Sequence, residues 1–212
     1  MDVLVVGGHG KVGLRLLRLL AAAGHRARGV VRDPAHAADL QAAGAEPVVL
    51  DVEREELVGA VAGADAVVFA AGAGPGSGPE RKRTVDLGGA LKLIDAARAD
   101  EVRRYVMVSA MGAASPPSGD EGMAPYLQAK AAADEALVGS GLDYTIVRPG
   151  GLTDEPGTGR IAAARSLGRR GSIPRDDVAA TLLAVLETPG TVGKTFELIS
   201  GESEIADAIA AL

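Results

Sequence analysis

The chain has 212 residues, of which 47% are apolar and only 2% aromatic, and its formal net charge is −6. This length is typical of one domain with a core of aliphatic side chains, and the negative charge argues against a general nucleic-acid-binding protein. The absence of cysteine excludes disulfides and thiolate metal sites. No apolar run approaches the roughly 20 residues of a membrane span, and the N-terminal residues lack the pattern of a signal peptide, so we expect a cytoplasmic protein.

Short apolar segments that favour strands alternate with helical patterns along the chain. The expected strands are residues 2–7, 26–32, 46–52, 65–72, 103–110 and 142–150. The expected helices are residues 11–24, 33–43, 54–63, 81–99 and a helix that begins near Pro125 and ends near 139–141. Within 151–212 we expect a helix at 175–187, a strand at 194–200 and a final helix from Ser203.

This alternation, with strands made almost entirely of Val, Ile and Leu, is typical of a parallel sheet covered by helices on both faces. We therefore predict an α/β fold, a Rossmann-like doubly wound parallel sheet, in one domain over residues 1–212. Residues 151–212 are too few for a separate substrate domain and form a short substrate-side portion. The glycine-rich or polar loops at 73–80 and 112–122 follow strands, so they are expected at the ligand-binding edge of the sheet.

A glycine-rich loop, VVGGHGKVG at residues 5–13, joins the first strand to the first helix. Gly7 is expected to allow the tight turn, Gly10 the close approach of a pyrophosphate, and Gly13 close packing of the helix. The free N–H groups and the positive end of the helix would face the phosphates. The position of the motif predicts a dinucleotide site, and a glycine-rich turn without a ligand is the alternative.

The end of the second expected strand indicates which dinucleotide is bound. An acid there binds the ribose hydroxyls of NAD, whereas an arginine accommodates the 2′-phosphate of NADP. The sequence has Arg32 at this point, and Asp33, which precedes a proline, is better explained as a helix cap. We therefore favour NADP(H) over NAD(H). Lys11 would add positive charge near the phosphates or is an exposed lysine, and Asp51 would accept from the adenine amino group or is a solvated turn residue.

The segment APYLQAKAAAD, residues 124–134, places Tyr126 four residues before Lys130. In a helix these positions lie on the same face, so both side chains can reach one point. The spacing is compatible with catalysis and also with two polar residues on an exposed helix face.

Taken together, these segments resemble the atypical short-chain dehydrogenase/reductase superfamily, in particular its small NmrA-like or NAD(P)H-binding members. The resemblance covers nearly the whole chain and is carried by VVGGHGKVG, VVRDP, LDV, FAAG, VDLGGALKLIDAA, YVMVSAMG, YLQAK, SGLDYTIVRPGGLTDEPGTG and SIPRDDVAATLLAVLE. One departure is His9, where relatives commonly have Thr or Ala. That position is used mostly through its backbone, so the departure does not put cofactor binding in question.

The resemblance implies an active site made of Ser109, Tyr126 and Lys130. Ser109 would hydrogen-bond the substrate oxygen, Tyr126 would donate or accept its proton, and Lys130 would hold the nicotinamide ribose. A free tyrosine has a pKa near 10, and a nearby ammonium lowers it toward a useful range. The loop at 148–152 resembles the segment whose backbone contacts the nicotinamide carboxamide.

The matching motifs also imply further cofactor contacts and no metal ligand. With the residues named above, the predicted contacts include His9, Val12, Val52, Ala70, Ala71, Gly72, Pro149, Gly150, Gly151 and Leu152.

The resemblance favours an NADP(H)-dependent reductase or dehydrogenase that acts on a small carbonyl or alcohol. A non-catalytic NADP(H)-binding redox sensor is the first alternative, and a nucleotide-sugar epimerase or dehydratase is the second. The short C-terminal portion argues against the sugar enzyme. Arg169 and Arg170 are compatible with an acidic substrate or with a solvated basic turn. The sequence predicts neither the identity of the substrate nor the oligomeric state.

Overall fold

The centre of the molecule is a large sheet to which each of the predicted strands contributes. The computed structural model describes residues 1–74, 76–119 and 121–212, so Pro75 and Asp120, within the two predicted loops, lie outside the described residues. The strands are β1 (Asp2–Val6), β2 (Arg26–Val31), β3 (Glu46–Val49), β4 (Ala66–Phe69), β5 (Arg104–Val108), β6 (Asp143–Pro149), β7 (Gly151–Thr153), β8 (Arg160–Ala164), β9 (Ser172–Pro174), β10 (Lys194–Ser200) and β11 (Ser203–Glu204).

The sheet has nine strands in the order β11-β8-β10-β6-β5-β4-β1-β2-β3. Every pair from β3 to β10 is parallel, and only β8 and β11 run antiparallel to their neighbours. The chain order reverses between β1 and β4, which is the doubly wound arrangement with its ligand crevice at that switch point. Strands β7 and β9 form a separate two-stranded parallel sheet.

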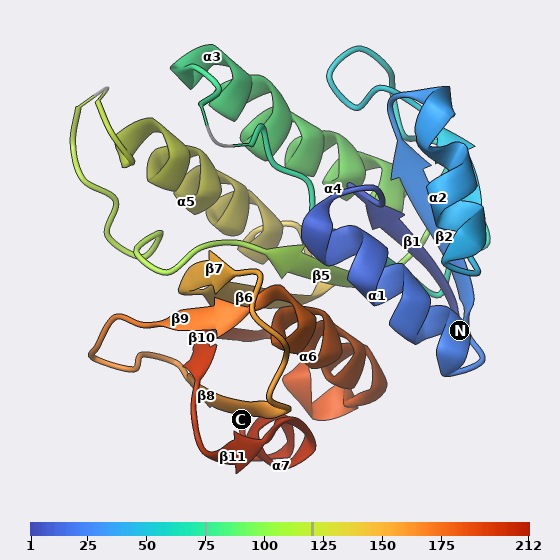
Figure 1. Cartoon of the computed structure of the whole chain (residues 1–212). Coiled ribbons are helices and arrows are strands. Elements are labelled where there is room, and N and C mark those ends of the chain that lie inside the picture. Colours follow the sequence, from blue (N-terminus) through green and yellow to red (C-terminus); the bar gives the residue numbers. More distant parts are fainter. Residues whose placement is uncertain (75, 120) are drawn as a thin grey trace.

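Helices cover both faces of the sheet (Figure 1). The α-helices are α1 (Lys11–Ala22), α2 (Ala37–Ala42), α3 (Pro79–Arg81), α4 (Gly89–Ala99), α5 (Ala124–Val138), α6 (Arg175–Glu187) and α7 (Ile205–Ala210). Short 3-10 helices are η1 (Pro34–His36) and η3 (Pro189–Thr191), and a π-helix, η2 (Lys82–Gly88), lies between α3 and α4. Among the described residues, no helix is long and apolar enough to cross a membrane.

The central strands β1, β2, β4 and β5 are buried on both sides along most of their length, which explains their largely apolar sequences. In β1, Val3 and Val5 pack into a core with α1 and α6, whereas Leu4 and Val6 pack into a second core with α4 and α5. Alternate side chains of a strand point to opposite faces, so one five-residue segment supplies both cores. This is the pattern from which the parallel sheet was predicted, and the structure confirms it.

The predicted helix at 54–63 is wrong. The segment consists of turns, although Leu57 and Val61 are fully buried, as a helical spacing of four residues suggests. Gly59 and Gly63 have φ angles of +83° and +74°, a left-handed conformation that interrupts a right-handed helix. The segment therefore covers the sheet without forming a helix.

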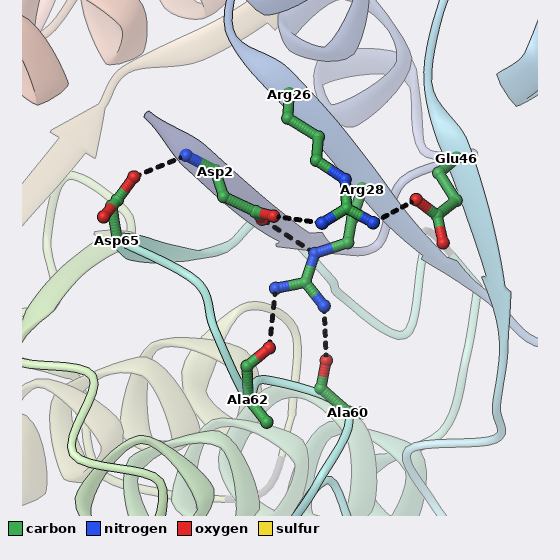
Figure 2. Close-up of polar contacts among 7 residues, drawn as sticks. All are labelled: Asp2, Arg26, Arg28, Glu46, Ala60, Ala62 and Asp65. Atoms are coloured by element: carbon green, nitrogen blue, oxygen red, sulfur yellow. Dashed lines mark hydrogen bonds and ion pairs between the residues drawn. The ribbon is translucent and has the colours of Figure 1, made fainter.

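A distant side chain stabilises these turns (Figure 2). The buried guanidinium of Arg28 in β2 donates to the carbonyl oxygens of Ala60 at 3.0 Å and Ala62 at 3.3 Å. Its Nε donates to Asp2 at 2.7 Å, and Asp2 also accepts from Arg26. We call Asp2, Arg26, Arg28 and Glu46 the Asp2–Arg28 cluster. In a helix these carbonyls would accept hydrogen bonds from the helix backbone. Here Arg28 donates to them instead, and because Arg28 is distant in the sequence, the local pattern alone misassigns the segment.

Other differences are smaller. The predicted helix at 81–99 does end at Ala99, but its first part is the π-helix η2. In 151–174, where no element was predicted, the structure adds the short strands β7, β8 and β9. The final helix begins at Ile205 rather than at Ser203, which belongs to the two-residue strand β11.

Candidate active site

A cleft of about 1970 Å³ opens at the carboxyl ends of the parallel strands. It is lined by the last residues of four of these strands, Val6, Val31, Val108 and Pro149. The predicted site positions that line the cleft are Gly7, His9, Gly10, Lys11, Val12, Arg32, Asp51, Val52, Ala70, Ala71, Gly72, Ser109, Tyr126, Lys130, Pro149, Gly150, Gly151 and Leu152. Of the predicted set, Gly13 alone does not line it.

The glycine loop has the geometry of a phosphate cradle. Gly7 has a φ of +87°, and a Cβ there would lie 2.7 Å from the backbone nitrogen of Ala71. A Cβ on Gly13 would lie 2.2 Å from the Gly7 carbonyl oxygen, so Gly13 allows α1 to pack on the loop. Gly10 caps α1 without a side-chain hydrogen bond, so the first N–H groups of the helix face the cleft uncapped. These residues fit a dinucleotide pyrophosphate.

Arg32 lies at the end of β2 with its side chain 61% exposed and 3.6 Å from Glu53. Glu53 also accepts from Arg81 at 2.9 Å and from Thr84 at 2.7 Å, and the Arg81 hydrogen bond is the main cause that holds the pKa of Glu53 below its usual value. Asp33 accepts from the backbone N–H of Ala35, so the predicted helix cap is present. Arg32 is thus an exposed charged side chain at this turn, with one long ion pair to Glu53.

Three other predicted contacts already have partners in the protein. Lys11 donates to Asp154 at 2.6 Å, and Asp51 accepts from the backbone N–H of Glu53 at 3.0 Å. His9 stacks on His36, with ring centroids 3.7 Å apart and ring planes inclined by 6°. Both imidazoles line the cleft.

Tyr126 and Lys130 lie one turn apart on α5 and both line the cleft. The Lys130 ammonium is 5.9 Å from the centroid of the Tyr126 ring, and the Lys82 ammonium is 5.3 Å from it. Lys130 is 2% exposed and donates to the carbonyl oxygens of Val108 at 3.1 Å and Ala71 at 3.4 Å. The spacing of four residues therefore brings the two side chains to one place, beside a second lysine that sequence reasoning missed.

Asp86, in the π-helix η2, is a buried partner of Lys130. Its side chain is fully buried, and Oδ1 lies 3.5 Å from the Lys130 ammonium. Oδ2 accepts from the backbone N–H of Ala73 at 3.0 Å, while Oδ1 has no hydrogen-bond partner among the described residues. Sequence reasoning missed Asp86 because the pairing joins two separate helices, and no local spacing predicts it.

Asp134 lies one further turn along α5 and is a third buried charge beside Lys130 and Asp86. Its Oδ2 accepts from the Ser109 hydroxyl at 2.8 Å and from Arg148 at 2.9 Å, and burial raises its pKa above the usual range. We call Ser109, Asp86, Lys130, Asp134 and Arg148 the Lys130 cluster. The helical spacing of four that links Tyr126 to Lys130 also links Lys130 to Asp134, so the sequence did carry a signal for this residue.

The electrostatics of the cleft keep Tyr126 protonated. Burial, with smaller contributions from Asp86 and Asp134, raises the pKa of Tyr126 to about 12. Burial lowers the pKa of Lys130, against the opposing effect of Asp86 and Asp134. The expected lowering of this pKa by the nearby ammonium is therefore outweighed by burial, and Tyr126 is protonated at neutral pH.

The segment after β6, residues 150–152, lines the same cleft as these residues. The backbone N–H of Gly150 donates to Leu198 at 2.8 Å, and that of Gly151 donates to Gly171 at 2.9 Å. A Cβ on Gly150 would lie 2.3 Å from the Gly171 carbonyl oxygen, so only glycine allows this approach. The pairing brings the loop before β9 next to Leu152 and the cleft.

Comparisons with known proteins identify a family and several similar proteins. Residues 7–189 match the model of the NAD(P)H-binding family. The chain is 43% identical to the uncharacterised sugar epimerase YhfK of Bacillus subtilis, over 99% of both chains. A solved structure from Bacillus halodurans, provisionally named an NAD-dependent epimerase/dehydratase, is 41% identical with a TM-score of 0.96 over 100% of both chains. The oxidoreductase ylbE of Lactococcus lactis is 29% identical, with a TM-score of 0.88 over 100% of this chain and 96% of that one.

Proposed function

Because the chain belongs to the NAD(P)H-binding family, we propose that it is an NADP(H)-dependent oxidoreductase that acts on a small carbonyl or alcohol. The observation that carries the proposal is the position of Tyr126. Its ring lines the same cleft as the glycine loop and lies 5.9 Å from the Lys130 ammonium, measured to the ring centroid. A proton donor beside a dinucleotide site is what the reduction of a carbonyl requires.

The cofactor would be held by the glycine loop and by Arg32. The backbone of Gly7 and Gly10 and the uncapped start of α1 suit the pyrophosphate. Arg32 suits the 2′-phosphate of NADP, because its guanidinium is exposed and its distance to Glu53 is long, at 3.6 Å. Asp33 is engaged as a helix cap rather than extended toward a ribose, which favours NADP(H) over NAD(H).

When bound, NADPH supplies the hydride that adds to the carbonyl carbon. Tyr126, which is protonated at neutral pH, donates a proton to the carbonyl oxygen. The Lys130 ammonium stabilises the resulting tyrosinate, and Asp86 holds Lys130 in place at 3.5 Å.

Ser109 completes the proposed site, but its hydroxyl already makes a hydrogen bond within the protein. Its hydroxyl donates to Asp134 at 2.8 Å, so it must rotate away from Asp134 before it can donate to a substrate oxygen. Residues 151–212 supply the substrate side of the cleft, through Leu152 and the loop between β8 and β9.

The test is oxidation of NADPH, followed by its absorbance, with a panel of small aldehydes and ketones. At least one carbonyl should be reduced, and Tyr126→Phe should lower kcat about 100-fold or more while the Kd for NADPH stays unchanged. Val138→Ala, an exposed change on the same helix, serves as the control and should leave kcat unchanged.

A different result would favour the alternative function, a non-catalytic redox sensor. If the protein binds NADPH but no carbonyl of the panel oxidises it, or if Tyr126→Phe leaves turnover unchanged, the reductase proposal fails. A non-catalytic NADP(H)-binding sensor would then be the better explanation.

An epimerase is a second candidate, because the relative from Bacillus subtilis is named a sugar epimerase and shares 43% of its residues with this chain. Epimerisation takes a hydride from the sugar and returns it, so it consumes no cofactor. Incubation of the NAD- or NADP-loaded protein with a nucleotide sugar, with NMR of the sugar carbon centres, separates the two functions. Inversion at one carbon without net oxidation of the cofactor would favour the epimerase.

A further inference from the structure

Positive charge gathers in the cleft of a chain that is negative overall. Eight basic and five acidic side chains line the cleft, whereas the whole chain has a net charge of −6. Six of the basic side chains have a partner within the protein: Lys11 and Arg175 pair with Asp154, Arg32 and Arg81 with Glu53, Lys130 with Asp86, and Lys82 with the Gly74 carbonyl. The charges of five of them are therefore partly neutralised by carboxylates of the chain, whereas the partner given for Lys82 is an uncharged carbonyl.

Arg169 and Arg170 differ from these six. Both are exposed and both line the cleft. In the part of the chain that the structure describes, neither has a hydrogen-bond or ion-pair partner. An unpaired guanidinium retains its full capacity for a bidentate contact with a carboxylate or phosphate.

The loop that carries the two arginines is fixed at both ends. Before them, the backbone N–H of Leu167 donates to Glu197 in β10 at 2.8 Å. After them, the Gly171 carbonyl accepts from Gly151 at 2.9 Å, and a Cβ on Gly171 would lie 2.9 Å from the Ile199 side chain. The arginines are thus held next to the segment at 150–152 and not on a free tail.

Apolar side chains line the same cleft from other elements. Met111 and Pro117 follow β5, and Met123 and Leu127 lie at the start of α5 close to Tyr126. A ligand that contacts these residues buries apolar surface. The combination of apolar contacts and two unpaired guanidinium groups fits a ligand with a small apolar body and an anionic group.

We propose that Arg169 and Arg170 bind a carboxylate or phosphate on the substrate, so that the substrate is a small carbonyl compound that carries such an anionic group. The carbonyl in this description rests on the proposed function. The anion site rests on the arginines alone and can be tested without turnover.

The kinetic experiment compares two aldehydes of equal shape. 4-Carboxybenzaldehyde carries an anion, and 4-carbamoylbenzaldehyde replaces it with a neutral amide. We expect kcat/KM to be at least about tenfold higher for the carboxylate in the wild-type chain, and the double variant Arg169→Gln/Arg170→Gln to abolish this preference. Equal values for the two aldehydes, or a preference that survives in the double variant, would overturn the proposal.

The binding experiment separates this proposal from the proposed function. Benzoate, phenyl phosphate and benzamide are titrated by calorimetry into the NADP-loaded chain. One or both anions should bind and benzamide should not, with binding lost in the double variant. If neither aldehyde is reduced but an anion binds through the arginines, the reductase fails and the anion site stands. If neither anion binds in this way, the anion site is wrong even when aldehydes are reduced.

Two controls make the result specific. Arg165→Gln removes an exposed arginine of the same loop that does not line the cleft, and it should leave anion binding unchanged. The double variant should also bind NADPH with the wild-type Kd. A loss of NADPH binding in the double variant would show that the arginines serve the cofactor, which would overturn the proposal.

Discussion

Two groups of charged residues lie at opposite edges of the central sheet, and they differ in how completely the hydrogen bonds of their buried members are made. In the Asp2–Arg28 cluster, at the amino ends of β1, β2 and β3, Arg28 donates to Asp2, Ala60 and Ala62 (Figure 2). In the Lys130 cluster, at the carboxyl edge, one oxygen each of Asp86 and Asp134 has no hydrogen-bond partner among the described residues.

The difference indicates two uses of buried charge. A fully bonded cluster stabilises the fold, because each desolvated group has regained the hydrogen bonds it lost from water. An incompletely bonded cluster costs stability and is retained where its groups meet a ligand or change protonation. Tyr126 and Lys130, whose pKa values are shifted, both lie at the carboxyl edge, where the incompletely bonded cluster is found.

The largest expected effect is on stability, at the amino edge. Arg28→Met should lower the free energy of unfolding by about 3 kcal/mol, because it leaves Asp2 and two carbonyl groups without their donor. Chemical denaturation measures this loss. Arg26→Met, in the same cluster but with a side chain 61% exposed, is the matched control and should cost less than about 1 kcal/mol. NADPH affinity should be unchanged in both, and a weaker affinity in Arg28→Met would mean that the two edges are coupled.

At the carboxyl edge, Asp86→Asn should affect catalysis as well as stability. The amide retains an acceptor for Ala73, but the buried Lys130 ammonium loses its carboxylate partner, so the free energy of unfolding should fall by about 2 kcal/mol. Without the carboxylate, the pKa of Lys130 falls further, so kcat/KM should drop about tenfold and the alkaline limb of its pH profile should move to lower pH. A large loss of stability with an unchanged pH profile would show that Asp86 is structural, like Arg28.

Arg32→Ala tests an exposed charge of the carboxyl edge. The Kd for NADPH should rise about tenfold and that for NADH should not change, because only NADPH carries the 2′-phosphate. Fluorescence titration measures both constants. Arg54→Ala, which removes an exposed arginine outside the cleft, is the control. If Arg32→Ala weakens both cofactors equally, or neither, the preference for NADP(H) is wrong.

The smallest expected effect is a pH dependence of stability. The pKa of Tyr126 is raised from 10.0 to about 12, so its contribution to stability is fully present below pH 10 and is lost as the pH rises toward 12. Tyr126→Phe lacks this titration, and its Tm should therefore fall less than that of the wild type across the same range. Lys130 acts in the opposite direction, but it is present in both proteins. Parallel Tm curves would mean that Tyr126 is not buried as described.

The sequence predicts the sheet well, because strands buried on both faces have an unmistakable apolar pattern. The fold and the family are confirmed, and so is a nicotinamide dinucleotide as the cofactor class. The helix at 54–63 could not be rejected from the sequence. Its apolar spacing is helical, and the competing hydrogen bonds come from Arg28, about thirty residues earlier.

The residues of the candidate site also divide into those that the sequence predicts and those that it does not. Gly7 and Arg32 were predicted from their positions at strand ends, and Ser109 from the family resemblance, and all three line the cleft. Asp86 was not predicted, because its contact with Lys130 depends on how two helices pack. Asp134 was within reach of the helical spacing on α5, and Arg148, its partner, lies in the predicted loop motif at 148–152.

The π-helix η2 has a consequence for how the chain tolerates insertions and deletions. A π-turn accommodates one more residue than an α-turn, so η2 is equivalent to a single-residue insertion in the helix that carries Asp86. Deletion of one residue between Asp86 and Gly89 would restore a regular α-helix and rotate the carboxylate by about 100°, away from Lys130. The apolar contacts of α4, which begins only at Gly89, would be retained. A length change of one residue in this segment is therefore expected to abolish the site while it spares the fold.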